Sequence, residues 1–191
     1  MCEVASRQFP GGTEVEMSML FIDVRGSTDL SEKMGNKEFS QLINRFYTKS
    51  TKVITEADGL VEKLAGDAVA AFWGAGFAGP NYVRRTVEVA QKLARTMSRQ
   101  GIPVGIGVHA GVAYFGAVGT AGGLTNISAI GDEVNTAARL ASQAAAGEII
   151  VSEQALQAAG IDGNDLEMRS LELKGISEPV LVRILPTNRK A

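Results

Sequence analysis

The chain has 191 residues, enough for one domain with a sizeable core, and its 45% hydrophobic and 21% charged residues are typical of a globular protein. A net charge of −2 argues against a broad nucleic-acid surface, which needs a basic excess. One cysteine, Cys2, excludes an internal disulfide, and no apolar run approaches the roughly eighteen residues of a membrane span. We therefore expect a cytoplasmic protein whose partners include neither nucleic acid nor a membrane.

The first half of the chain alternates short apolar runs with amphipathic stretches, which predicts strands mixed with helices. The long helix is predicted from apolar residues that recur at three- and four-residue steps, and Asp58-Gly59 ends it. In chain order we expect a strand at 18–22, a helix from 27 to 57, a hairpin of 60–64 and 68–73 with its turn at 65–67, and a helix that begins at 78–81.

The second half continues the same pattern with shorter pieces. We expect strands at 104–108 and 112–118, a Gly-rich hairpin tip at 119–125, a helix over 134–141, a strand at 149–151, a helix at 152–159, and a strand pair of 166–173 and 180–185. This order predicts an α/β (α+β) fold, a ferredoxin-like sandwich with a mostly antiparallel sheet and helices on one face. We expect the domain to span 14–187, with a lead-in or linker at 1–13 and a tail at 188–191.

Two aspartates stand where a predicted strand meets a glycine. Asp23 follows the first strand, and Asp67 lies in the turn of the hairpin. If the hairpin lies beside the first strand, the two carboxylates come together and can hold two divalent ions roughly 3.5–4 Å apart. Mg²⁺ suits such a site because it takes few protein oxygens. The alternative interpretation is that both are ordinary turn or helix-capping aspartates.

Other polar residues offer contacts for a phosphate. Gly26, Ser27 and Thr28 begin a helix, where free backbone N–H groups favour an anion, although a simple capped turn has the same pattern. Asn135 and Arg139 are four residues apart and share one face of the third helix. They could clamp a reacting phosphate or form a solvated polar face.

Two lysines could bind nucleotide or simply lie on the surface. Lys63 interrupts an apolar strand, and Lys174 follows Leu173 near the end of the chain. His109 is the single histidine, so with one cysteine a structural zinc site is not expected, and we predict a buried, hydrogen-bonded histidine. The stretch 105–111 does not open a helix, which argues against a dinucleotide fingerprint.

Taken together and in this order, these segments resemble the class III nucleotide cyclase catalytic domain over nearly the whole chain. The matching segments are Phe-x-Asp-x-x-Gly-x-Thr at 21–28, Lys63, Gly66-Asp67, Val-Asn-x-Ala-x-Arg at 134–139, and Leu-Lys-Gly at 173–175. This resemblance implies roles for individual residues, a substrate and a dimeric assembly.

The resemblance assigns a role to each matching residue. Asp23 and Asp67 would bind two divalent cations, Mg²⁺ or Mn²⁺, with the Val24 carbonyl as a main-chain ligand. Asn135 and Arg139 would stabilise the transition state, and Lys174 would bind the triphosphate of the substrate.

Purine selection is also implied by the resemblance, at two positions. Lys63 matches the base-reading lysine of adenylate cyclases, where guanylate cyclases usually carry Glu. The second base reader, seven residues before Asn135, is usually Asp, or Thr in a bacterial subgroup, and here it is Ser128. A Ser hydroxyl can donate or accept a hydrogen bond, so this departure bears on the choice of purine.

The resemblance implies an adenylate cyclase that converts ATP to 3′,5′-cyclic AMP and pyrophosphate. Sites in this family form between two subunits, so we expect a homodimer with the hairpin arm at 119–125 reaching the partner, and a regulatory domain in a longer protein. The alternatives are a guanylate cyclase, a non-catalytic cyclase-like domain that dimerises or senses nucleotide, and an RNA-binding module. A diguanylate cyclase would need a Gly-Gly-Asp/Glu-Glu-Phe stretch, which the sequence lacks.

Overall fold

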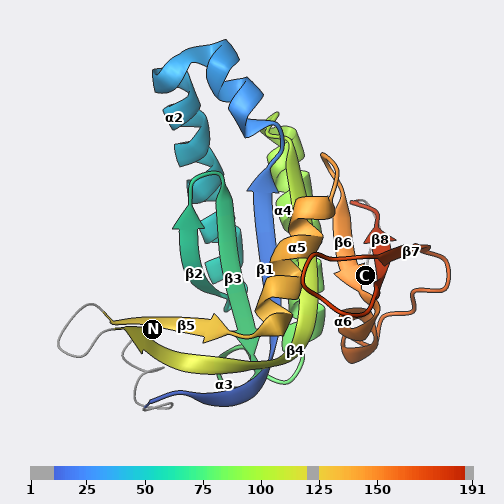
Figure 1. Ribbon diagram of the computed structural model, residues 1–191. Coiled ribbons are helices and arrows are strands. Elements are labelled where there is room, and N and C mark those ends of the chain that lie inside the picture. The colour runs from blue at the N-terminus through green and yellow to red at the C-terminus, as the bar shows by residue number, and fades with distance from the viewer. Residues whose placement is uncertain (1–10, 120–124, 188–191) are drawn as a thin grey trace.

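A computed structural model describes residues 11–119 and 125–187 of the chain. Figure 1 shows one twisted eight-stranded sheet with helices on both faces. The strands are β1 (Thr13–Val24), β2 (Leu60–Ala65), β3 (Ala68–Gly74), β4 (Val104–Gly119), β5 (Thr125–Ile130), β6 (Ile149–Ser152), β7 (Glu167–Leu171) and β8 (Val180–Leu185). The helices are α2 (Ser27–Thr55), α3 (Ala75–Ala78), α4 (Tyr82–Arg99), α5 (Asp132–Gln143) and α6 (Glu153–Ala158).

The sheet is mostly antiparallel, as the sequence predicts. Its strand order is β2-β3-β1-β4-β6-β8-β7, and β5 pairs with the far half of β4. Strand β1 lies between β3 and β4 and is antiparallel to both, whereas β4 and β6 are parallel. The predicted α+β fold is therefore confirmed, and β1 carries Asp23 into the middle of the sheet.

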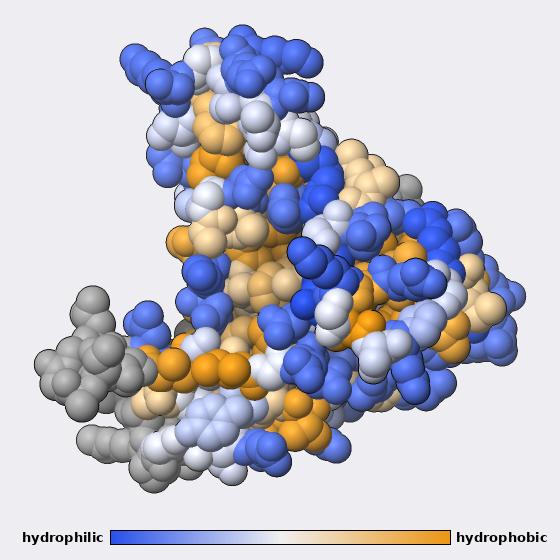
Figure 2. Space-filling model, viewed as in Figure 1, coloured by the Kyte–Doolittle hydropathy of each residue, from blue (hydrophilic) through white to orange (hydrophobic). Residues whose placement is uncertain are grey.

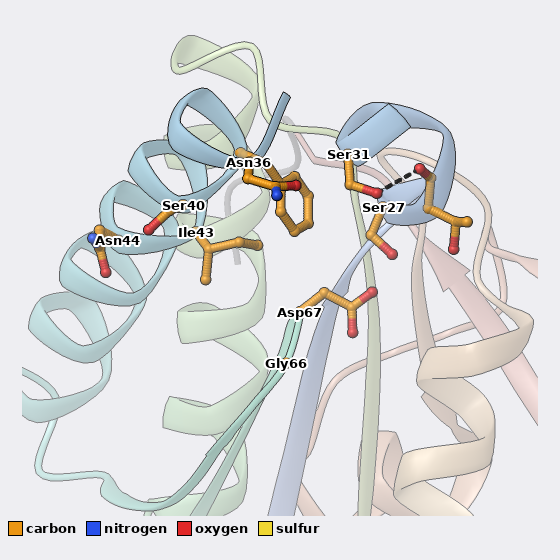
Figure 3. A pocket seen from close by; sticks show the side chains of 10 residues that line it. Ser27, Ser31, Asn36, Ser40, Ile43, Asn44, Gly66 and Asp67 are labelled. Atoms are coloured by element: carbon orange, nitrogen blue, oxygen red, sulfur yellow. Dashed lines mark hydrogen bonds between the residues drawn. The ribbon is translucent and has the colours of Figure 1, made fainter. Parts of the chain in front are cut away.

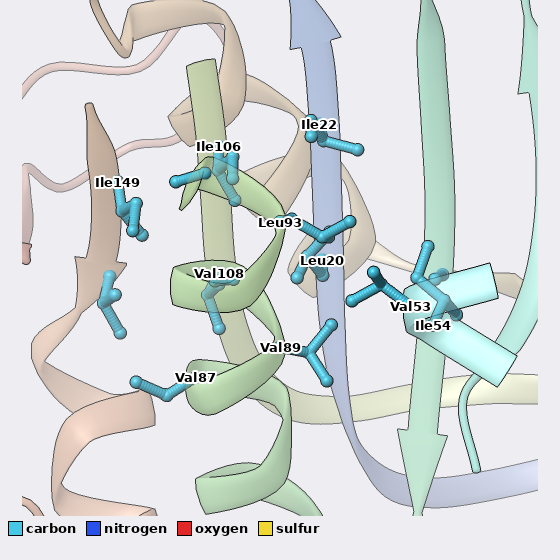
Figure 4. Packing of buried hydrophobic residues seen from close by; sticks show 14 of the residues in the cluster. Leu20, Ile22, Val53, Ile54, Val87, Val89, Leu93, Ile106, Val108 and Ile149 are labelled. Atoms are coloured by element: carbon cyan, nitrogen blue, oxygen red, sulfur yellow. The ribbon is translucent and has the colours of Figure 1, made fainter. Parts of the chain in front are cut away.

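One face of the sheet holds the main hydrophobic core. Alternate residues of β1, such as Leu20 and Ile22, are fully buried on this face. Helix α4 covers them with Val87, Val89 and Leu93, as Figure 4 shows, and α2 packs beside α4. This packing is what the three- and four-residue spacing of apolar side chains in both helices predicts.

The opposite face carries α5, so the helices are not all on one face as the sequence analysis expected. Two of the β4 residues that face α5, Gly105 and Gly107, are glycines two positions apart. A Cβ on Gly107 would lie 2.2 Å from the Ala141 backbone nitrogen, and one on Gly105 would lie 2.7 Å from the Ala144 carbonyl oxygen. The helix can therefore contact the sheet directly, and Gly105 and Gly107 form its seat.

Several boundaries differ from the expected ones. Strand β1 extends to Thr13, and the two strands expected at 104–108 and 112–118 are one strand, β4. Helix α2 is interrupted at Gly35, whose φ of 74° a helix does not contain. Helix α3 and strand β5 were not predicted. The tip of the expected arm, 120–124, lies outside the described residues, but Gly119 and Thr125 pair at its base.

Within the described parts of the chain, none of the helices combines the length and the apolar character that crossing a membrane requires.

Candidate active site

The sheet register brings Asp23 and Asp67 together, as the sequence predicts. Asp23 pairs with Ala68, the residue that follows Asp67 in the hairpin. The Val24 N–H donates a hydrogen bond of 2.9 Å to the Asp67 carbonyl oxygen. The Tyr47 hydroxyl of α2 donates a bond of 2.7 Å to the Gly66 carbonyl, which ties the turn to the helix. The two aspartates therefore belong to one fixed cluster at the end of β1.

Charge at this cluster is concentrated and only partly neutralised. Burial raises the pKa of the Asp23 carboxyl, the Arg25 guanidinium opposes that rise, and the charge of Asp67 adds to it. Burial also raises the pKa of the Tyr47 phenol, with a further contribution from Asp67. Two neighbouring carboxylates that repel each other in this way are stabilised by a bound cation.

Arg25 is a residue of this site that the sequence analysis did not single out. Its Nη2 lies 3.1 Å from Asp23 Oδ2, and its Nη1 donates a 3.1 Å hydrogen bond to the Ser142 carbonyl at the end of α5. The Arg25 and Asp23 side chains are 21% and 32% exposed, so solvent screens the pair only in part. Arg25 thus connects the carboxylate cluster to the helix that carries Asn135 and Arg139.

The start of α2 lies next to the carboxylates. Gly26 is the N-cap, with a φ of 65°, and no side chain caps the helix. The backbone N–H groups of the first turn, which includes Ser27 and Thr28, are therefore open to an anion. Gly26 has open space where a Cβ would be, so its positive φ is the reason for glycine here.

A cavity of about 520 Å³ adjoins this turn. Figure 3 shows Ser27 and Ser31 on one wall and residues of the later part of α2 on the other, with Asp67 beneath them. Six of the ten residues that line the cavity carry hydroxyl or amide side chains, and the full lining is Ser27, Thr28, Ser31, Asn36, Phe39, Ser40, Ile43, Asn44, Gly66 and Asp67. The cavity exists because α2 turns away at Gly35.

Helix α5 brings Arg139 beside the Lys174 loop. Leu140 of α5 and Leu173 of the β7–β8 loop are buried in one hydrophobic cluster. A Cβ on Gly175 would lie 3.2 Å from Arg139 Nη2, so the guanidinium rests against this glycine. Asn135, one turn earlier on α5, is exposed. The structure therefore places Arg139 next to the segment that carries Lys174.

The two expected base readers lie on strands β2 and β5. Lys63 is exposed on β2 and pairs with Ala70. Ser128 of β5 is half-buried, and its hydroxyl donates a 2.8 Å hydrogen bond to Glu62 Oε1, next to Lys63 in the chain. This hydrogen bond joins β5 to β2 through Ser128, which was expected from the sequence, and Glu62, which was not.

Four polar side chains of the candidate site have no protein partner within the described ranges. Between residues 11 and 119 and between 125 and 187, the side chains of Lys63, Asn135, Arg139 and Lys174 form no hydrogen bond or ion pair. Three of them are cations. Their groups are available to an anionic ligand or to a second subunit.

A cation at this site would be held by the two aspartates. Among the described residues, no group of three or more His, Cys, Asp or Glu side chains could hold a metal ion. Asp23, Asp67 and the Val24 carbonyl offer a small set of oxygen ligands, which fits Mg²⁺ or Mn²⁺ because these ions also take water and phosphate oxygens.

His109 is buried and hydrogen-bonded, as predicted. It is 3% exposed, its Nδ1 lies 2.7 Å from Ser152 Oγ, and its Nε2 bonds to Glu133 on α5. Ser152 Oγ already accepts the Ala155 N–H, so its own proton can go to Nδ1 and the Nε2 proton to Glu133. This network ties α5 to β4 and α6.

Comparison with known proteins identifies the family. Residues 12–180 match the family described as the adenylate and guanylate cyclase catalytic domain. Because the match covers most of the chain, the protein belongs to the class III nucleotide cyclases and is a cyclase catalytic domain. Class III cyclases generally use divalent metal ions.

Relatives and solved structures are similar to this chain over most of its length. The uncharacterized protein Rv1320c of Mycobacterium tuberculosis is 33% identical over 190 residues, which cover 92% of this chain and 32% of that protein, so the chain spans about a third of its length. The adenylyl cyclase CyaB from P. aeruginosa is 25% identical with a TM-score of 0.82, covering 93% of this chain and 97% of that one. The guanylyl cyclase Cya2 is 26% identical with a TM-score of 0.78, covering 91% and 92%.

Proposed function

We propose that this domain is an adenylate cyclase that converts ATP to 3′,5′-cyclic AMP and pyrophosphate. The observation that carries the proposal is the joining of Asp23 and Asp67 by the Val24–Asp67 hydrogen bond, next to the uncapped start of α2. Carboxylates beside open N–H groups suit a metal-bound triphosphate. Lys63 at the base-reading position supports ATP over GTP.

Each residue then has a role in one in-line displacement. The ribose 3′-oxygen attacks the α-phosphorus, and pyrophosphate leaves. Asn135 orients the ribose, Arg139 stabilises charge on the α-phosphate, and Lys174 binds the leaving phosphates. The first turn of α2 binds the phosphates with backbone N–H groups. Divalent cations held by Asp23 and Asp67 would lower the pKa of the 3′-hydroxyl and offset the triphosphate charge.

The active form in this proposal is a homodimer with two shared sites. One subunit contributes Asp23 and Asp67, and the other contributes Lys63, Ser128, Asn135 and Arg139. The unpaired state of Lys63, Asn135 and Arg139 supports this division, because their partners would come with nucleotide and the second subunit.

An apolar surface beside α5 supports the same dimer. Figure 2 shows that apolar residues gather over β5 and in the hollow between α2 and α5. Ile130 is 51% exposed and Leu64 is 46% exposed. A second copy of the chain would cover such residues symmetrically.

The second candidate is a guanylate cyclase, because Cya2 is as similar in sequence as CyaB. Product formation from ATP and from GTP, with Mn²⁺ and then Mg²⁺, separates the two by chromatography. Cyclic AMP from ATP with little cyclic GTP is the expected result. Cyclic GTP as the main product supports the guanylate alternative. No cyclic product from a dimeric preparation supports a non-catalytic cyclase-like domain.

A further inference from the structure

The hydrogen bond between Ser128 and Glu62 links the two base-reading strands. Ser128 Oγ donates to Glu62 Oε1 at 2.8 Å, across 66 residues of sequence, and both residues are half-buried. The next nearest acceptor for this hydroxyl is the Ala129 carbonyl oxygen at 3.5 Å. The Ser128 hydroxyl therefore donates its proton to the Glu62 carboxylate, which is the nearer acceptor.

Glu62 also determines which face of the sheet Lys63 occupies. Val61 pairs with Ala71, and regular pairing would next set Glu62 opposite Ala70. A bulge intervenes, so Lys63 takes that place. Ala70 also pairs with Phe21 of β1, so Lys63 and Phe21 lie on the same face of the sheet. Asp23 is two residues after Phe21 and lies on that face as well. The extra residue in the strand is Glu62 itself.

The direction of this hydrogen bond limits what Ser128 can offer a base. A serine hydroxyl has one proton, and here it goes to Glu62, which leaves Ser128 Oγ as an acceptor. Lys63 can act only as a donor. One acceptor beside one donor matches adenine, whose N6 amino group donates and whose N1 accepts. Guanine presents the same two positions in reverse, because its O6 accepts where the adenine N6 donates and its N1–H donates where the adenine N1 accepts. An acceptor placed at the N6 position and a donor placed at the N1 position therefore match adenine and not guanine.

We propose that Glu62 is a specificity-determining residue that fixes Ser128 as a hydrogen-bond acceptor and so favours adenine over guanine. The proposal rests on the proposed cyclase function and adds a residue that acts through Ser128. It makes the serine, which could otherwise donate or accept, selective for one purine.

The test compares variants that change this hydrogen bond and little else. In Glu62→Gln the amide can donate to Ser128, which frees the hydroxyl to donate to guanine O6. The ratio of kcat/KM for ATP to that for GTP should fall about tenfold, since a site loses discrimination when a polar contact is no longer fixed. Ser128→Ala should lower the same ratio, and Ser128→Thr should keep it.

A matched control and a double variant separate selectivity from stability. Glu88→Gln alters an exposed glutamate on α4 and should leave the ratio unchanged. If Glu62 acts through Ser128, adding Glu62→Gln to Ser128→Ala should change the ratio no further. Melting curves show whether each variant is folded, and the Thr variant preserves the hydroxyl if the Ala variant is unstable.

A binding measurement keeps failure of this proposal distinct from failure of the proposed function. Displacement of a fluorescent nucleotide by non-cyclisable ATP and GTP analogues, with Mn²⁺ present, gives the same ratio without turnover. The wild type could make no cyclic product and still prefer the ATP analogue, with that preference lost in Glu62→Gln. This result would refute the proposed cyclase activity and would support the specificity role of Glu62. An ATP preference that stays within about twofold of wild type in Glu62→Gln overturns the specificity role.

Discussion

Asp23 is the residue on which the proposed chemistry of this domain most depends. It lies on the central strand, next to the turn that carries Asp67 and beside the guanidinium of Arg25. In Asp23→Asn the side chain keeps its size but loses the charge that binds a cation. We predict a fall in turnover of at least about a hundredfold, because the site loses the electrostatic stabilisation of the transition state.

The control for this variant is Asp29→Asn, which changes an exposed aspartate in the first turn of α2. Product is measured by chromatography, the fold by circular dichroism, and Mn²⁺ binding by calorimetry. Asp23→Asn should retain its spectrum and lose Mn²⁺ binding, whereas Asp29→Asn should keep both. Near-full turnover in a folded Asp23→Asn protein would refute the metal assignment.

Arg25 supports Asp23 from within the same segment. We predict that Arg25→Met lowers the free energy of unfolding by about 1–3 kcal/mol, because the charged hydrogen bond to the Ser142 carbonyl is lost and Asp23 keeps no neighbouring cation. Urea denaturation measures the change. Lys33→Met, on an exposed part of α2, is the matched control and should be nearly neutral. Equal free energies of unfolding for the two variants would show that the Arg25 contacts do not stabilise the fold.

The sequence predicts that Asp23 and Asp67 lie close together, but it does not predict the contacts around the candidate site. Asp23 and Asp67 could be placed together because a hairpin beside the first strand leaves little choice of register. The contacts of Arg25 with Ser142 and of Glu62 with Ser128 could not be predicted, because these partners are 117 and 66 residues away in the chain. Such contacts depend on how α5 and β5 fold back over the sheet, which no local pattern encodes.

At the scale of elements, the approach of α5 to β4 positions Asn135 and Arg139. That approach depends on Gly107, because a Cβ there would lie 2.2 Å from the Ala141 backbone nitrogen. We predict that Gly107→Ala pushes α5 away from the sheet, lowers the free energy of unfolding by about 1–3 kcal/mol through overpacking, and reduces turnover.

Gly163→Ala is the comparison for this variant. The added methyl group would meet Leu156 at an ordinary distance of 3.4 Å, so little change is expected. Urea denaturation and product formation are measured on both proteins. If Gly107→Ala and Gly163→Ala have the same free energy of unfolding and the same turnover, the close contact at Gly107 is not what positions α5.

The element predictions succeed where a repeat of side chains is clear and fail where geometry intervenes. Helix α4 and strand β8 follow from periodicity alone. The glycines of 105–111 could be recognised as unsuited to a dinucleotide site, but not as the seat of a helix that comes much later in the chain. The bulge at Glu62 is likewise invisible in the sequence, although it decides the face of Lys63.

For the whole molecule, the central claim is a cyclase site completed by two subunits. Asp23 and Asp67 form one set, and the side chains of Lys63, Asn135 and Arg139 form another that has no partner within the described chain. Because a symmetric dimer repeats both sets, each dimer would hold two equivalent sites. Variants that damage different sets should therefore complement each other.

The most direct measurement is cyclic AMP formation after mixing Asp67→Ala protein with Arg139→Ala protein. Each variant alone should be inactive. Mixed dimers should have one intact site in two, so the mixture should regain about a quarter of wild-type activity if subunits pair at random. Native mass spectrometry confirms that mixed dimers form. Mixed dimers without recovered activity would contradict a site shared between subunits.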